Sequence, residues 1–142
     1  MEKSRGLPAQ TLTFVLFQKT WIYHWDVVGP NFQQLHTLFG GQYETMFEEL
    51  DRLSEHMRYL NVKPLSSLSR MLEVTQIKEA ASSTGAKEML QELLDNNTKF
   101  CELMTEISEE SEAQKQYATA NLVQDLMESH GKFVWQLRSH LQ

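Results

Sequence analysis

One run of apolar residues, spaced alternately three and four positions apart, constrains the fold of this chain more than any other feature. Spacing of this kind places the side chains on one stripe of a long α-helix, which must pack that stripe against other helices. In the rest of the chain apolar residues also recur at steps of three and four. No stretch alternates strictly between apolar and polar residues with turn residues on both sides, as a β-strand would. The sequence therefore predicts an all-α fold. The run is Phe32, Leu35, Phe39, Tyr43, Met46, Leu50, Leu53, Met57 and Leu60.

Length and composition fit one compact domain. The chain has 142 residues, of which 41% are hydrophobic, with only six glycines and three prolines. This is enough to bury a core. We expect a single domain over residues 1–142, with four long helices. Apolar periodicity puts them at about residues 8–28, 32–61, 85–108 and from 112 to the end of the chain.

The predicted connections come from turn and capping residues. Gly29-Pro30 predicts a tight corner, since proline restricts the residue before it and glycine tolerates that conformation. Asn31 with Gln34 and Ser111 with Gln114 resemble capping boxes, the second after a polar break at residues 109–111.

The longest predicted connection covers residues 61–84, which is too long for a plain hairpin. Residues 65–74 predict a short helix inside it, capped by Ser66 or Ser67. Two short connections and one long crossover describe a ferritin-like four-helix bundle. The short extra helix then lies in the crossover between the second and third long helices.

Charge and cysteine content limit the partners and the compartment. The formal net charge is -6, and Lys3 and Arg5 are the only basic residues among the first ten, so DNA binding is not expected. The single cysteine, Cys101, forms no internal disulfide, and the N-terminal region has no long apolar stretch. We expect a cytoplasmic protein with no membrane span.

Two imidazoles and two carboxylates form the candidate metal ligands: His24, His36, Asp51 and Glu55. Along a helix rising about 1.5 Å per residue, His36 and Asp51 lie about 22 Å apart, so one chain cannot bring both to one ion. Both nevertheless point from the same side of the helix. A two-fold axis near residues 43–45 would face His36 with Asp51 and Glu55 of a second copy. This geometry predicts two equivalent sites between subunits, which His24 can approach across the Gly29-Pro30 corner.

The motif His24-Trp25-x-Val27-x-Gly29-Pro30-x-Phe32-x-x-Leu35-His36, followed by Asp51-x-x-x-Glu55, resembles the signature of the Dps family, the miniferritins. Nearly the whole chain aligns, including Pro64-Leu65 and Lys132-x-x-Trp135-x-Leu137-Arg138.

The resemblance implies a hollow dodecamer, built from two-fold dimers, that oxidises Fe(II), preferably with hydrogen peroxide, and stores the ferric mineral. It gives His24, His36, Asp51 and Glu55 the ferroxidase ligand roles, with the carboxylates coming from the two-fold mate. It gives Trp25 the place of an aromatic residue that supplies or quenches a radical electron. Neutral imidazoles suit Fe(II), and carboxylates stabilise the ferric product by charge.

Two departures from the family pattern bear on activity. Gly40 stands where the family usually has Asp or Glu. We therefore expect a weakened site in which water or Glu44 partly replaces the missing ligand. Gly40 and Gly41 each cost about 1 kcal/mol inside a helix, which suggests a close approach at the dimer axis. Tyr117 and Asn121 replace the acidic pore residues of many members, leaving Asp125 and Glu128 as possible iron attractors.

Other interpretations remain open. Asp51 and Glu55 can be a solvated face paired with Arg52 or Arg58. Zinc or another divalent ion suits the same ligands. A structural or DNA-associated shell with an inactive site is the main alternative function. Three further histidines show no partner pattern and are expected at the surface: His56, His130 and His140.

Overall fold

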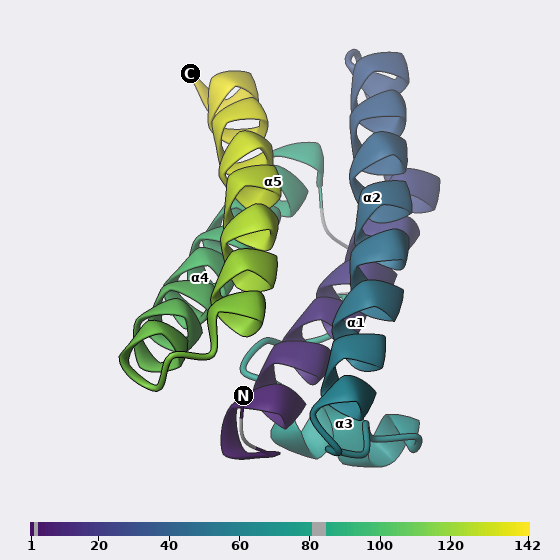
Figure 1. Ribbon diagram of the computed structural model, residues 1–142. Coiled ribbons are helices and arrows are strands. Elements are labelled where there is room, and N and C mark those ends of the chain that lie inside the picture. Colours follow the sequence, from purple (N-terminus) through teal and green to yellow (C-terminus); the bar gives the residue numbers. More distant parts are fainter. Residues whose placement is uncertain (2, 81–84) are drawn as a thin grey trace.

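The computed structural model describes residues 1, 3–80 and 85–142, and the regular secondary structure in this part of the chain consists of α-helices (Figure 1). The predicted all-α bundle with a short extra helix in the crossover is confirmed, and no strand occurs among the described residues. The predicted connection reached residue 84, so its last four residues lie outside the described ranges. The helices are α1 (Lys3–Asp26), α2 (Phe32–Tyr59), α3 (Leu68–Val74), α4 (Ala86–Ala113) and α5 (Tyr117–Leu141).

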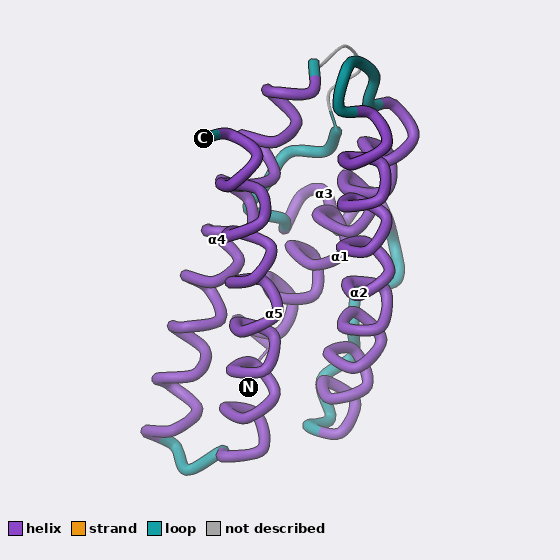
Figure 2. Tube along the Cα trace, turned by 90° about the horizontal axis from the view of Figure 1, so that it is seen from above, coloured by secondary structure: helices purple, strands orange, loops and turns teal. Residues whose placement is uncertain are grey.

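The bundle consists of two helical hairpins. Helix α1 packs along α2 and α4 packs along α5, and these are the two most extensive helix contacts (Figures 1 and 2). Contact between the hairpins runs mainly through α1 and α4, and is sparser between α2 and α5. Helix α3 lies against α1 near the end of α2. One face of α2 is therefore left uncovered within the subunit.

The core is built from the predicted apolar stripes. On α2, Leu35, Phe39 and Met46 are almost fully buried, as the spacing of three and four requires. Their counterparts on α4 include Leu93 and Phe100. The stripes thus place the core between the hairpins, and the polar faces point outward.

Helix α1 begins earlier than predicted and contains Pro8. Proline removes one backbone donor, which is why we placed it at the helix start. Helix α1 nevertheless extends across it, and the next residues, Ala9 and Leu12, are fully buried. Tertiary packing therefore outweighs the local cost of proline. The helix ends at Asp26, two residues before the predicted end.

Both predicted capping boxes are wrong. Asn31 occupies the N-cap of α2, but its side chain makes no capping hydrogen bond. Ser111 is buried inside α4, which continues to Ala113, so the predicted polar break is absent. The chain turns at residues 114–116 instead, where Lys115 has a φ of 59°. Glutamates at 109 and 110 are good helix formers, and packing around Ser111 extends the helix past them.

The crossover is tied to the bundle by buried polar contacts. The Gln10 amide donates to the Leu65 carbonyl at 2.9 Å and accepts from the Leu65 N–H at 2.9 Å. Lys19 donates from Nζ to the Lys78 carbonyl at 3.1 Å and to Asn96 Oδ1 at 3.0 Å. Burial lowers the pKa of Lys19. Ser67 caps α3, as one of the two predicted candidates, by accepting from the Arg70 N–H.

The predicted surface position of His130 is wrong, because this side chain is fully buried between α2, α4 and α5. Its Nε2 lies 2.5 Å from Glu49 Oε2, and its Nδ1 lies 2.8 Å from Asn97 Oδ1. Asn97 also donates from Nδ2 to the Leu93 carbonyl at 2.8 Å, so its Oδ1 must accept from His130. The ring of Phe100 stacks on the imidazole, with centroids 3.6 Å apart.

The sequence did contain a signal for this network. His130 continues the α5 stripe between Leu126 and Phe133, at steps of four and three. Glu49 and Asn97 likewise occupy core positions of the stripes on α2 and α4. A polar residue at a core position of each of three helices indicates a shared buried contact, because buried polar groups need partners.

Replacing His130 with leucine should destabilise the fold by about 3 kcal/mol, because Glu49 would keep a buried carboxylate without its partner. The measurement is the free energy of unfolding from urea denaturation. His140→Leu, on the exposed part of the same helix, is the control. Adding Glu49→Met to His130→Leu should recover much of the loss, and an unchanged stability in His130→Leu would contradict this account.

Candidate metal centre

The two predicted histidine ligands meet at the corner between α1 and α2. His24 lies in the last turn of α1, and His36 lies near the start of α2. Gly29 holds the corner with a φ of +115°, a conformation that L side chains rarely adopt. The two imidazole rings stack with centroids 3.7 Å apart and an interplanar angle of 14°. The corner thus brings together two residues twelve positions apart in the sequence.

Each histidine is oriented by the backbone of the other. His24 Nδ1 lies 2.5 Å from the main-chain oxygen of His36, and His36 Nδ1 lies 2.7 Å from that of His24. A carbonyl only accepts, so both Nδ1 atoms donate. In neutral rings both Nε2 atoms then carry free lone pairs. This is the usual arrangement of a metal-binding histidine, whose other nitrogen donates to a carbonyl or carboxylate.

Gly40 leaves room for the His24 ring beside α2. A Cβ added to Gly40 would lie 3.1 Å from His24 Cε1 and 3.2 Å from His24 Nδ1, which is closer than ordinary contact. A close approach at Gly40 thus occurs within the subunit, between α2 and the His24 ring. The close approach at the dimer axis stays a prediction. Gly41 has nothing within 4 Å of the corresponding Cβ position, and the structure gives no steric reason for it.

The two predicted carboxylates lie further along α2. Asp51 and Glu55 are both exposed, and Asp51 lines a surface pocket of about 500 Å³ together with Glu48 and Ser54. Among the described residues neither carboxylate forms an ion pair. The alternative pairing with Arg52 is not found, since Arg52 binds Asp125 at 3.0 Å.

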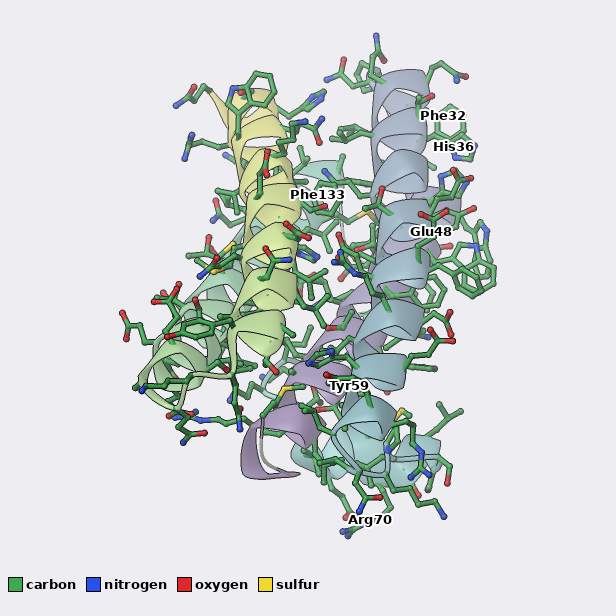
Figure 3. The ribbon with its side chains drawn as sticks, in the orientation of Figure 1. Phe32, His36, Glu48, Tyr59, Arg70 and Phe133 are labelled. Carbon is green, nitrogen blue, oxygen red and sulfur yellow. The ribbon has the colours of Figure 1, made fainter. Side chains whose placement is uncertain are left out.

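One chain alone does not assemble the metal centre. Within the described residues, no three side chains of His, Cys, Asp or Glu come close enough to hold one ion. His36 and Asp51 lie about 22 Å apart along α2, at about 1.5 Å per residue, and His24 stays with His36 at the corner. Figure 3 shows His36 and Glu48 on the side of α2 that faces away from α5. The candidate ligands therefore form two separate groups within one subunit.

An aromatic cluster lies beside the histidine pair. Trp25 is 57% exposed and packs on Trp21, with ring centroids 4.9 Å apart. Trp21 stacks on Tyr43 at 5.6 Å, and Tyr43 meets the edge of His24 at 5.2 Å. Phe47, which is 62% exposed, continues the cluster along α2. The exposed face of α1 and α2 thus carries an aromatic cluster between the histidine pair and the two carboxylates.

The other sequence candidates fall elsewhere. Tyr117 and Asn121, the predicted pore positions, are exposed near the start of α5. Asp125, one expected iron attractor, is held by Arg52, whereas Glu128 is exposed. His56 is half-buried against Thr119, and burial lowers its pKa. Of the three histidines expected at the surface, only His140 is exposed.

Comparison with known proteins identifies the fold. The Ferritin family model, described as a ferritin-like domain, matches residues 9–142. The Dps structure from Thermosynechococcus elongatus superimposes with a TM-score of 0.95, covering 99% of this chain and 89% of that one at 26% identity. The chain belongs to the Dps branch of the ferritin-like family.

Two further relatives agree with this assignment. A DNA protection during starvation protein from Brevibacillus brevis is 30% identical over 131 residues, covering 90% of this chain and 86% of the relative. A Dps structure from Vibrio cholerae, described as a member of a broad superfamily of ferritin-like diiron-carboxylate proteins, has a TM-score of 0.91 at 27% identity, covering 99% of this chain and 89% of that one. Family membership supports a role in iron storage and protection. No described helix is both long and apolar enough to cross a membrane.

Gly40→Ala and Gly41→Ala form a matched pair that tests the histidine arrangement. Alanine at position 41 meets no neighbour and should stabilise the helix by about 1 kcal/mol. Alanine at position 40 should gain less, because it pushes the His24 ring away from the His36 carbonyl and weakens a hydrogen bond worth about 1 kcal/mol. Urea denaturation measures the difference, and ¹⁵N NMR of His24 Nδ1 reports the bond. Equal gains with an unchanged His24 spectrum would refute the proposed reason for Gly40.

Proposed function

We propose that this protein is an iron-storage miniferritin that oxidises Fe(II), preferably with hydrogen peroxide, at sites shared by two subunits. The observation that carries the proposal is the His24–His36 pair, whose Nε2 atoms are both free to bind metal while both Nδ1 atoms are fixed by carbonyls. His24, His36, Asp51 and Glu55 are the proposed ligands. The ferritin-like family supports iron as the metal and gives no support to zinc.

The uncovered face of α2 explains why the site needs a second copy. If two subunits pack this face antiparallel about a two-fold axis, the histidine pair of one meets the carboxylates of the other. The contact is isologous, so one dimer contains two such sites. The exposed aromatic cluster lies between the two halves and would be buried in the same contact. Apolar area of this kind is what a stable subunit interface buries.

The ligand set suits the proposed reaction. Fe(II) is the substrate, and two Fe(II) ions supply the two electrons that, with two protons, reduce one hydrogen peroxide to two waters. Paired electron delivery avoids release of hydroxyl radical. Neutral imidazoles hold Fe(II), and the carboxylates stabilise the added charge of Fe(III). Trp25, exposed beside His24, is the proposed donor of an electron to any one-electron oxidant formed at the site.

Storage of the mineral requires a closed shell, for which we propose a dodecamer of these dimers in the cytoplasm, each subunit a single domain. The rival function is a structural or DNA-associated shell in which Gly40 has inactivated the site. Arg5 weighs against DNA binding, because its guanidinium is held by Glu106 at 2.9 Å and Glu110 at 2.6 Å. A basic side chain engaged in this way is not free to neutralise phosphates.

Mixing two inactive variants tests whether the site is shared. His24→Ala/His36→Ala subunits lack one half, and Asp51→Ala/Glu55→Ala subunits lack the other. In a mixed dimer one of the two sites is intact, so random reassociation should restore roughly a quarter of the wild-type peroxide-dependent Fe(II) oxidation. Each variant alone should be inactive.

The controls for this mixture separate the alternatives. Sedimentation of each variant confirms that it still assembles, and mixing without dissociation of the subunits should restore nothing. Inactivity of the wild type itself would favour the structural or DNA-associated shell. An active wild type with no recovery in the reassociated mixture would exclude a site between subunits.

A further inference from the structure

The Gly40 substitution leaves the proposed site one carboxylate short of the family pattern. The structure shows that position 40 is crowded, since a Cβ there would lie 3.1 Å from His24 Cε1 and the ring would have to shift to admit it. Glycine fits this space without displacing the ring, and a compensating carboxylate would then come from elsewhere. In a site shared by two subunits, the partner helix is the nearest source.

The register of the proposed two-fold contact identifies the position. In an antiparallel pair, each step forward along one α2 is a step backward along the other. When His36 faces residues 51 and 55, the position four residues after His36 therefore faces residues 47 to 51. Gly40 thus lies opposite the part of the partner helix that contains Glu48.

Glu48 also has the right orientation on its own helix. At about 100° per residue, its side chain lies within about 60° of those of Asp51 and Glu55. Glu48 and Asp51 line the same surface pocket. Figure 3 shows that Glu48 points from the same side of α2 as His36. Position 48 thus shares the face that carries the other proposed ligands.

The local charge is unbalanced in a way that favours a cation. Glu48, Asp51 and Glu55 are exposed, and among the described residues none of them forms a hydrogen bond or an ion pair with a side chain. Arg52, the basic residue between them, is directed to Asp125 on α5. Three carboxylates within two helical turns repel one another, and a bound cation relieves that repulsion.

We infer that Glu48 supplies, across the subunit interface, the carboxylate that Gly40 lacks. The inference rests on the proposed function and adds one ligand to it. Glu44 is the other nearby acid and the one that the sequence favoured for this role. In the proposed register, however, it lies at the two-fold axis and faces its own copy rather than Gly40, so Glu48 replaces it here. Glu44 also does not line the pocket that Glu48 shares with Asp51. The site then contains His24 and His36 from one subunit and Glu48, Asp51 and Glu55 from the other.

Glu48→Gln tests this inference, with Glu44→Gln as the matched control on the same face. Anaerobic calorimetric titration of the assembled, metal-free protein with Fe(II) gives the affinity and the number of ions bound per subunit. Glu48→Gln should weaken binding by at least tenfold or lose one ion per site, and Glu44→Gln should bind as the wild type does. Glu48→Asp should recover part of the binding, and sedimentation should show intact assemblies throughout.

Asp51→Asn separates failure of the inference from failure of the proposed function. If Asp51→Asn loses Fe(II) binding while Glu48→Gln does not, the shared site stands and Glu48 is not a ligand. If the wild type binds no Fe(II), or Asp51→Asn binds it normally, the proposed site itself is wrong. If Glu44→Gln and Glu48→Gln weaken binding equally, the effect is general surface charge, and the assignment of Glu48 as a ligand is overturned.

Discussion

The pair of hydrogen bonds between the His24 and His36 rings and each other's main-chain oxygens is the interaction on which the proposed site depends. The carbonyl of His24 lies in the last turn of α1, where helix geometry leaves acceptors without an intrahelical partner. His36 satisfies it, and His24 returns a bond to α2. The same two bonds close the corner and fix the tautomers. The Nε2 atoms of the proposed ligands are therefore already arranged by the fold, which would reduce the ordering cost of binding a metal.

This arrangement carries a cost that the rest of α2 must accommodate. A Cβ at position 40 would lie 3.1 Å and 3.2 Å from two atoms of the His24 ring, so a side chain there would displace the ring by a few tenths of an ångström. Glycine at position 40 also makes the helix about 1 kcal/mol less stable than alanine would. Long apolar packing on the opposite face of α2, through Phe39 and Met46, maintains the helix across the two glycines.

Much of the fold followed from the sequence, because the spacing of apolar residues along one helix can be read without knowing which other helices it contacts. The candidate site residues came from the motif, and the structure brings His24 and His36 together. Their meeting with Asp51 and Glu55 of a second copy stays a prediction. The predictions that were wrong concerned features that depend on tertiary packing. Asn31 and Ser111 matched capping patterns, but packing set the helix ends elsewhere. His130 was expected at the surface because the sequence showed no partner pattern for it. Its position on the α5 stripe nevertheless indicated burial.

The buried network of His130, Glu49 and Asn97 connects the core to the site through the rotation of α2. Glu49 is 7% exposed and binds His130 across the bundle, where α2 and α5 otherwise make few contacts. A side chain two residues further on points about 200° away, so an inward Glu49 requires an outward Asp51. An apolar residue at position 49 would tolerate small rotations of the helix, whereas a hydrogen-bonded pair does not. The polar contact in the core thus sets the direction of the carboxylates on the surface.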